Sequence, residues 1–384
     1  MITVPEKFVP ENYRQCSLTV MDNIQDPNIT FDENGVCNYY HDYKKLEKEQ
    51  VFQGDAGQKK LDELVVKIKK DGKGRSYDCV LGVSGGVDST YLAYLAKQWN
   101  LRVLCVHFDS GWNSELAVQN IENIVNRCGF DLYTHVFDWE EFKDLQLSHF
   151  KANVVDIEAI TDVGISGTLR LLALEKNVKY VLSGHNIVTE SILPRYWIFK
   201  DYYNIIDIHN KYGSLEKITT FPYFDNKFQQ LEARIKGIRD ANPLNFVRYV
   251  KEQVKQVIIN ELGWRDYGGK HYESIFTRFY QGYILPMKFG IDKRKAHLSN
   301  LIASGQITRK EAIEELKQPI MSSEQFEIDY PFVIKKLGST QEEFEKYIDA
   351  PRVEHSEFDT EQKFLGRNRV IKTLKNLKSR AVND

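Results

Sequence analysis

The stretch YDCVLGVSGGVDSTYLAYLAKQW, residues 77–99, decides the fold. Residues 79–83 form a short apolar run, partly β-branched and bounded by glycine, which is typical of a buried strand. From Asp88 onward the apolar residues recur on one side of a helix, with Asp88, Ser89 and Thr90 in its first turn. The sequence therefore predicts a strand that turns through Ser-Gly-Gly into the start of a helix.

A turn of this kind is well suited to bind a phosphate group. A helix start directs backbone N–H groups and the positive end of the helix dipole at one point. Gly85 and Gly86 allow a tight turn and let a ligand approach the backbone closely. The Walker pattern is absent because no lysine follows the glycines, and the dinucleotide pattern GxGxxG is missing as well.

Residues 84–90 resemble the SGGxDS pyrophosphate loop of the ATP pyrophosphatases, a superfamily that includes GMP synthetase, NAD synthetase, asparagine synthetase and several tRNA-modifying enzymes. A chance glycine turn is disfavoured, because the motif and its strand–helix context agree. The resemblance implies that Asp88 is a Mg²⁺ ligand. It implies that the nucleotide contacts the whole loop: Ser84, Gly85, Gly86, Val87, Asp88, Ser89 and Thr90.

Composition narrows the class of protein. The chain has 384 residues, a net charge of −2 and five cysteines, and the mild acidity argues against a strongly nucleic-acid-binding protein. Residues 1–16 hold no apolar signal core and no run approaches the length of a membrane span, so we expect a soluble, cytoplasmic protein without membrane insertion. Cys79 and Cys105 lie in apolar runs, which indicates buried thiols rather than disulfides.

Strand and helix patterns alternate after the loop. We predict strands over residues 102–109, 131–138 and 179–186 and helices over residues 114–129 and 165–177. This alternation predicts an α/β fold, a parallel sheet with helices on both faces. Ligands bind at the carboxyl ends of such strands, so Ser84, Asp109 and the segment Gly184-His185-Asn186 are expected to converge. Asp109 is equally consistent with a helix cap or a turn before Gly111.

The flanking regions differ from this core. We predict a small N-terminal module over residues 1–57 and the ATP-binding domain over residues 58–215. Residues 216–384 are predicted to form a mainly helical region that binds the substrate or a partner protein. Thr308 and Glu311 form a capping box. A charged cluster in the C-terminal region is either a solvated face or surrounds an anionic substrate. Its members are His271, Glu273, Arg278, Lys288, Lys293 and Arg294.

Two blocks carry a closer resemblance, YGGKHYESIFTRFYQGYILPMKFGIDKRKAHLSNLI at residues 267–302 and DPNITFDENGVCNYY at residues 26–40. They resemble the N-acetyl sugar amidotransferases of the WbpG and PseA type, from bacterial lipopolysaccharide O-antigen and flagellin-glycan biosynthesis. The resemblance extends from about Cys16 to the C-terminus. It implies an adenine nucleotide α-hydrolase-like fold, and ATP with Mg²⁺ as cofactors. It also implies conversion of an acetamido group to acetamidino through an O-adenylyl imidate and ammonia.

The same resemblance implies further site residues. In the superfamily the strand ending at Gly184-His185-Asn186 lies beside the nucleotide and acidic residues follow it. Ile187 and Val188 stand where relatives often have aspartates, so the metal role falls on Glu190. Lys288, Lys293 and Arg294 are candidates, as catalytic residues, for contacts to phosphate or to the acidic groups of the sugar.

The substrate and nitrogen source follow from the resemblance too. The substrate is expected to be a nucleotide-activated sugar, either a CMP-linked nine-carbon acid such as pseudaminic or legionaminic acid or a UDP-linked diacetamido uronic acid. No N-terminal cysteine nucleophile is present, since Ile2 follows Met1. The resemblance implies that ammonia comes from a separate HisH-like glutaminase, similar to that of imidazole glycerol phosphate synthase, with a HisF-like cyclase as a further partner.

The N-terminal module departs from the family pattern of two Cys-x-x-Cys pairs, which suits a structural zinc. Cys16 is followed three residues later by Thr19, and Cys37 by Tyr40. His41 replaces at most one missing ligand, so we predict a degenerate zinc-ribbon-like module without zinc.

Two other functions share the loop. A tRNA-modifying enzyme would bind ATP in the same way but should carry a basic surface. A non-catalytic partner in a glycan-assembly complex would bind ATP without releasing pyrophosphate.

Overall fold

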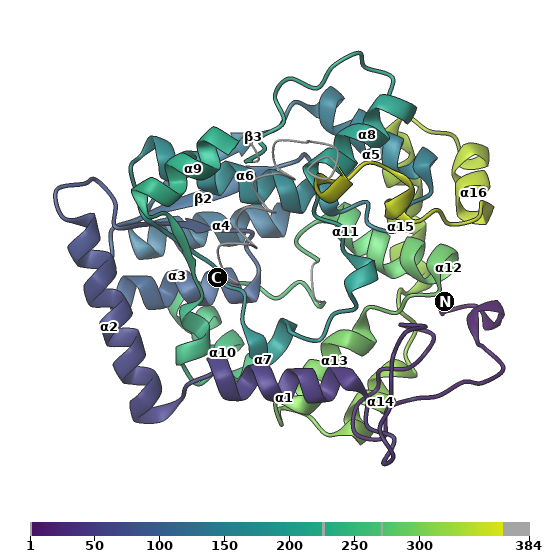
Figure 1. Cartoon of the computed structure of the whole chain (residues 1–384), viewed down its shortest axis with the longest axis horizontal. Helices are drawn as coiled ribbons and strands as arrows, with labels where there is room; N and C mark the ends of the chain where they lie inside the picture. The colour runs from purple at the N-terminus through teal and green to yellow at the C-terminus, as the bar shows by residue number, and fades with distance from the viewer. Residues whose placement is uncertain (1, 225–226, 270–271, 364–384) are drawn as a thin grey trace, which may run out of the picture.

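The chain folds around a five-stranded sheet in which all neighbouring strands are parallel (Figure 1). The computed structural model describes residues 2–224, 227–269 and 272–363. The strand order is β3-β2-β1-β4-β5. The strands are β1 (Cys79–Gly82), β2 (Val103–Asp109), β3 (Asp131–Val136), β4 (Tyr180–Leu182) and β5 (Arg239–Ala241). The predicted α/β fold with a parallel sheet is confirmed.

Helices cover both faces of the sheet, because successive strand residues point to opposite sides and both sides are apolar. Leu81 and Cys105 pack into one core with residues of α3 and α4, whereas Val80 and Val106 pack into another with residues of α6. The helices next to the sheet are α2 (Gly54–Gly72), α3 (Val87–Gln98), α4 (Glu115–Cys128) and α6 (Ala159–Glu175). Helix α6 begins at Ala159, before the predicted start at residue 165, and ends at Glu175 rather than at residue 177.

The region after the sheet is mainly helical, as predicted. Thr308 and Glu311 form the predicted capping box at the start of α14. Over the part of the chain that the structure describes, no helix is long and apolar enough to cross a membrane. The remaining helices are α1 (Asn38–Gln50), α5 (Trp139–Ala152), α7 (Ile187–Glu190), α8 (Tyr202–Tyr212), α9 (Lys227–Lys236), α10 (Lys251–Leu262), α11 (Ile275–Phe279), α12 (Leu285–Phe289), α13 (Arg294–Ala303), α14 (Arg309–Leu316), α15 (Ser323–Leu337) and α16 (Gln341–Asp349).

The N-terminal module packs against the helical region that follows the sheet. Met21 and Tyr43 share a core with Phe279 and Leu285, and α1 lies against α13 (Figure 1). The division at residues 57 and 215 stays a prediction, but strand β5 lies beyond residue 215 and still belongs to the sheet.

The N-terminal cysteines form a hydrogen-bonded cluster. Cys16 Sγ accepts from the backbone N–H groups of Thr19 at 3.4 Å and Cys37 at 3.2 Å. The Thr19 hydroxyl lies 3.7 Å from Cys37 Sγ, and all three residues are buried. Thr19 thus occupies one position where the family pattern has a thiolate. The zinc-free state of the module stays a prediction.

Helix α5 anchors the segment that follows α8 through two buried carboxylates. Glu141 accepts from the backbone N–H and the hydroxyl of both Thr219 and Thr220, at 2.6–2.8 Å. One turn later, Asp144 accepts from Ser214 and Leu215 N–H at 2.9 Å and pairs with His209 at 2.8 Å. Burial alone would raise the pKa of Glu141, but these hydrogen bonds outweigh it and lower the pKa.

We expect Glu141→Gln to lower the free energy of unfolding by about 1–3 kcal/mol. The glutamine side chain replaces one carboxylate oxygen with an NH₂ group, which cannot accept the hydrogen bonds that Thr219 or Thr220 donates to that oxygen. A lowered pKa in the folded state means that the carboxylate stabilises the protein at neutral pH and loses this effect as the pH falls through that pKa. The free energy of unfolding of the variant should therefore decrease less than that of the wild type when the pH is lowered. Urea denaturation between neutral and acidic pH measures both effects.

Glu140→Gln is the matched control, since Glu140 precedes Glu141 in α5 but its side chain is 67% exposed. Its stability should stay close to that of the wild type. Equal stability of the two variants would contradict the anchoring role.

Candidate active site

The loop between β1 and α3 has a backbone that glycine alone adopts without strain. Gly85 has φ +79°, and a Cβ there would lie 2.7 Å from the carbonyl oxygen of Ala117 in α4. Gly86 follows in an extended conformation as the N-cap of α3. The chain therefore reverses tightly against α4, and α3 begins at the carboxyl edge of the sheet.

Two hydroxyl groups of the loop border the start of α3, and a third is buried inside the first helical turn. Ser84 Oγ accepts from Gly86 N–H at 3.2 Å and lies 3.5 Å from Ser89 Oγ, so both serines border the start of α3. Thr90 is fully buried, and its hydroxyl donates to Gly86 O at 2.6 Å. The Thr90 hydroxyl thus holds the first helical turn, and the nucleotide contact of Thr90 stays a prediction. The Val87 side chain packs against the core, and its nucleotide contact also stays a prediction.

Asp88 is held in place from two other parts of the chain. Its Oδ1 accepts from the hydroxyl of Tyr249 and from Asn186 Nδ2 at 3.5 Å. Burial is the main cause that raises the pKa of Tyr249, and the negative charge of Asp88 raises it further. The Tyr249 hydroxyl therefore keeps its proton and donates it to Asp88 in the hydrogen bond. Tyr249 was not predicted, because it lies 161 residues from Asp88 in the chain and belongs to no motif.

The end of β4 meets the loop as predicted. A Cβ on Gly184 would lie 3.0 Å from Ser89 N, which is tighter than a real side chain tolerates easily. Strand β1 pairs with β2 on one side and β4 on the other, so this is the point where the strand order reverses and where such sheets bind ligands.

The residues after Gly184 form a small polar group. Asn186 is fully buried and caps α7 by accepting from Thr189 N–H at 3.0 Å. His185 Nδ1 lies 2.9 Å from Glu190 Oε2. Glu190 therefore has an imidazole partner, and its metal role stays a prediction.

Asp109 ends β2 and shapes the turn after it. Its Oδ1 accepts from Gly111 N–H at 2.8 Å and from Asn113 Nδ2 at 2.9 Å. The turn interpretation is thus confirmed, and the nucleotide contact stays a prediction. Asp109 also lines a recess of about 350 Å³ together with Val136, Trp139 and Lys336.

Most of the predicted C-terminal charges have structural partners. Lys288 is 6% exposed and donates to the carbonyls of Tyr347 and, at 2.6 Å, Ala350. Burial lowers its pKa to about 8. Arg294 contacts Asp292 at 2.8 Å and the Gln318 carbonyl at 3.0 Å. Both side chains thus have partners within the protein, and their catalytic role stays a prediction.

Arg278 is also structural, since it forms two hydrogen bonds of 2.7 and 2.8 Å with buried Asp329. Lys293 Nζ lies 3.8 Å from Glu158 Oε2, and its role stays a prediction. His271 lies outside the described residues.

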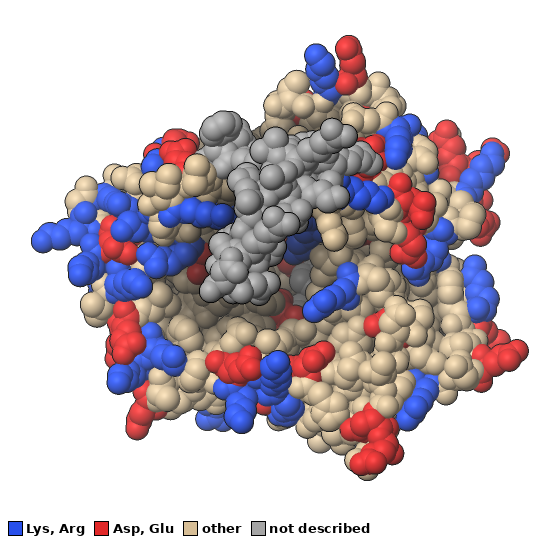
Figure 2. Space-filling view, viewed as in Figure 1, with Lys and Arg blue, Asp and Glu red and all other residues tan. Residues whose placement is uncertain are grey.

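Glu273 is the member of this cluster that reaches the loop. Its Oε1 lies 3.4 Å from where a Cβ of Gly86 would stand. Its backbone is fixed by Ser114 N–H, which donates to Glu273 O at 2.9 Å. Three carboxylates, from Asp88, Glu190 and Glu273, therefore come from three separate segments. Figure 2 shows one face of the molecule, which is hollowed near its centre and has acidic and basic side chains around the hollow.

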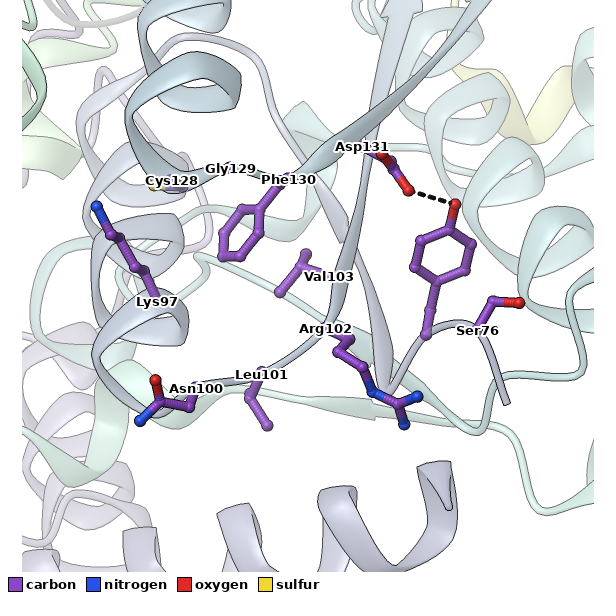
Figure 3. Close-up of a pocket in the computed structure, with 11 residues that line it drawn as sticks. Ser76, Lys97, Asn100, Leu101, Arg102, Val103, Cys128, Gly129, Phe130 and Asp131 are labelled. Carbon is purple, nitrogen blue, oxygen red and sulfur yellow. Dashed lines mark hydrogen bonds between the residues drawn. The ribbon is translucent and has the colours of Figure 1, made fainter. Parts of the chain in front are cut away.

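The larger described cavity lies elsewhere. It has a volume of about 450 Å³ and is lined by residues such as Tyr77, Arg102 and Asp131 (Figure 3). These residues stand at the amino ends of β1, β2 and β3, whereas the loop and the predicted contacts stand at the carboxyl ends. We therefore assign the site to the carboxyl edge.

Comparison with known proteins gives two family matches. Residues 273–377 match the family "LPS biosynthesis protein WbpG-like, C-terminal domain", and residues 58–162 match the NAD synthase family. A tRNA(Ile)-lysidine synthase from Chlamydia pneumoniae is 38% identical over 71 residues, which cover 17% of this chain and 22% of that protein. The chain thus matches about a fifth of the length of that relative.

Two solved structures are similar at low identity. NMN synthetase from Francisella tularensis has a TM-score of 0.38 at 15% identity, over 69% of this chain and 92% of that chain. The U34-tRNA thiolase NcsA from Methanococcus maripaludis, solved with its [4Fe-4S] cluster, has a TM-score of 0.32 at 14% identity, over 67% of this chain and 80% of that chain.

The NAD synthase match contains the loop, and the WbpG-like match begins at Glu273, the residue that lies against Gly86. These two matches support a protein of the WbpG type within the pyrophosphate-loop ATP pyrophosphatase superfamily.

Proposed function

We propose that the chain is an ATP-dependent amidotransferase that converts the acetamido group of a nucleotide-activated sugar to an acetamidino group. The observation that carries this proposal is the contact between the two matched segments, with the WbpG-like Glu273 against Gly86 of the loop. ATP use is common to the superfamily, and the WbpG-like segment supports a sugar of a bacterial surface glycan as the substrate. A cytoplasmic location belongs to the same proposal.

The reaction has to overcome two weaknesses of an amide, a poor electrophilic carbon and a poor leaving oxygen. The acetamido oxygen attacks the α-phosphorus of ATP, the bond to the β-phosphate oxygen breaks, and pyrophosphate leaves. Ammonia then attacks the carbon of the O-adenylyl imidate. AMP leaves with the former amide oxygen, and a proton is lost to give the amidine.

The chain contributes positioning and electrostatics rather than a covalent nucleophile. The N–H groups of Gly86 and the first turn of α3 hold the leaving pyrophosphate, and Ser84 and Ser89 contact it. Asp88, oriented by Tyr249 and Asn186, suits Mg²⁺, a cation that prefers carboxylate oxygens. Bound there, Mg²⁺ would neutralise charge that develops on pyrophosphate.

A tRNA-modifying activity is the second candidate, since the lysidine synthase match favours it. Incubation with ATP, Mg²⁺ and either tRNA or a panel of CMP- and UDP-linked acetamido sugars separates the two candidates by which substrate causes pyrophosphate release. ATP binding without pyrophosphate release under both conditions would indicate a non-catalytic partner.

The nitrogen source is the other part of the proposal. Burial raises the pKa of Cys79, Cys105 and Cys128, the latter two to about 12 and 11, so none is suited to act as a glutaminase thiolate. We therefore propose that a separate glutaminase, with a cyclase-like protein as a further partner, delivers ammonia to this chain.

We expect Asp88→Asn to keep the fold and to lower sugar-dependent pyrophosphate release by about a hundredfold or more, because the charge that binds the metal is lost. A pyrophosphate assay with ATP, ammonium and the sugar measures this. Asp55→Asn is the matched control, since Asp55 lies exposed in the first turn of α2. Unchanged release by the Asp88 variant would remove Asp88 from the site.

We expect the isolated chain to form the amidine from ammonium salts, faster at alkaline pH, because a larger share of the ammonium is then neutral ammonia. Glutamine alone should give no product until a glutaminase is added. Mass spectrometry of the sugar product measures both. Efficient turnover of glutamine by the isolated chain would contradict the assignment of Cys79, Cys105 and Cys128 as structural residues.

A further inference from the structure

We propose that Trp264 and Tyr267, which follow α10, are positioning residues that set the orientation of the pyrophosphate loop. The proposal rests on the proposed function in one respect, namely that this loop binds the pyrophosphate part of ATP. Both residues lie between the two segments that match known families.

The two side chains hold one carbonyl. Trp264 Nε1 donates to Gly85 O at 2.7 Å, and the hydroxyl of Tyr267 donates to the same oxygen. Trp264 is 2% exposed, and the two rings pack edge to face with centroids 5.3 Å apart. Two donors with restricted side chains therefore fix the direction of the Gly85 carbonyl.

The direction of this carbonyl decides the direction of the next N–H group. In a planar trans peptide the C=O and the N–H point to opposite sides. With Gly85 O turned toward Trp264 and Tyr267, Gly86 N–H is turned toward Ser84 Oγ, 3.2 Å away. This is the side of the loop where we place the pyrophosphate.

The loop needs this support because its peptides rotate easily. Glycine populates several backbone conformations at similar energy, so neither Gly85 nor Gly86 fixes the peptide between them. A preorganised N–H donor stabilises charge more effectively than one that must reorient during the reaction. Trp264 and Tyr267 supply the preorganisation without touching the nucleotide.

The test measures binding of Mg²⁺–pyrophosphate and of AMP by titration calorimetry, on the wild type, Tyr267→Phe and Trp264→Phe/Tyr267→Phe. The double variant leaves the buried carbonyl without either side-chain donor, so its pyrophosphate affinity should fall at least about tenfold. The single variant keeps the Trp264 donor and should show a smaller loss. AMP affinity should stay unchanged in both, since AMP does not use the Gly86 N–H group.

A matched control exists in the same chain. The carbonyl of Gln25 also accepts from one tyrosine and one tryptophan, Tyr196 and Trp197, the latter at 3.1 Å. Tyr196→Phe/Trp197→Phe removes the same pair of donors from a carbonyl of the N-terminal module. It should lower the melting temperature but leave pyrophosphate affinity at the wild-type value.

The outcomes separate the two proposals. If both loop variants bind Mg²⁺–pyrophosphate as tightly as the wild type does, the positioning role is overturned and the proposed function is unaffected. A parallel loss of AMP and pyrophosphate affinity would also overturn it, since that indicates general destabilisation. A wild type that binds neither Mg²⁺–ATP nor Mg²⁺–pyrophosphate would overturn both proposals. If the double variant does not fold, the pyrophosphate affinity of Tyr267→Phe decides.

Discussion

The left-handed backbone at Gly85 is the constraint on which the site depends. A side chain there would meet the Ala117 carbonyl at 2.7 Å, so the turn packs directly against α4. This turn lets a central strand pass into α3 with its N-terminus at the carboxyl edge of the sheet. Asp88 and Ser89 then face Gly184 at the end of β4, where the strand order reverses. A wider turn would separate these groups.

Segments that are distant in the chain complete the loop. Tyr249 orients Asp88, Trp264 and Tyr267 hold Gly85 O, and Glu273 lies against Gly86. Asp88 and Glu273 therefore both lie at a helix start that attracts anions. Carboxylates and phosphates repel one another unless a cation lies between them. The proposed binding of pyrophosphate at this loop therefore includes Mg²⁺.

The sequence predicted the parts of the fold that have local signals. Strands β1 and β2 are buried on both faces and form continuous apolar runs, and Thr308 with Glu311 forms a capping box that depends on spacing alone. Strand β5 was missed because it has three residues, Arg-Asp-Ala, of which two are exposed. Tyr249, Trp264 and Tyr267 were missed because their roles arise from contacts with residues 161–182 positions away.

The partners of charged residues were not predicted. The sequence displays the charge of Lys288 and Arg294 but not the groups that each side chain contacts in the fold. Lys288 contacts carbonyls at the end of α16, and Arg294 contacts Asp292. Similarly, the motif places Thr90 in the loop, whereas the first helical turn rotates its hydroxyl inward.

Tracing the acetamido oxygen of the sugar tests the central claim most directly. A sugar with a heavy oxygen isotope in its acetamido group is incubated with the protein, Mg²⁺, ATP and ammonium, and the products are analysed by mass spectrometry. Activation through an O-adenylyl imidate predicts that the label appears in AMP, in proportion to the amidine formed. Amidine formation with the label absent from AMP would contradict activation of the amide oxygen at this loop.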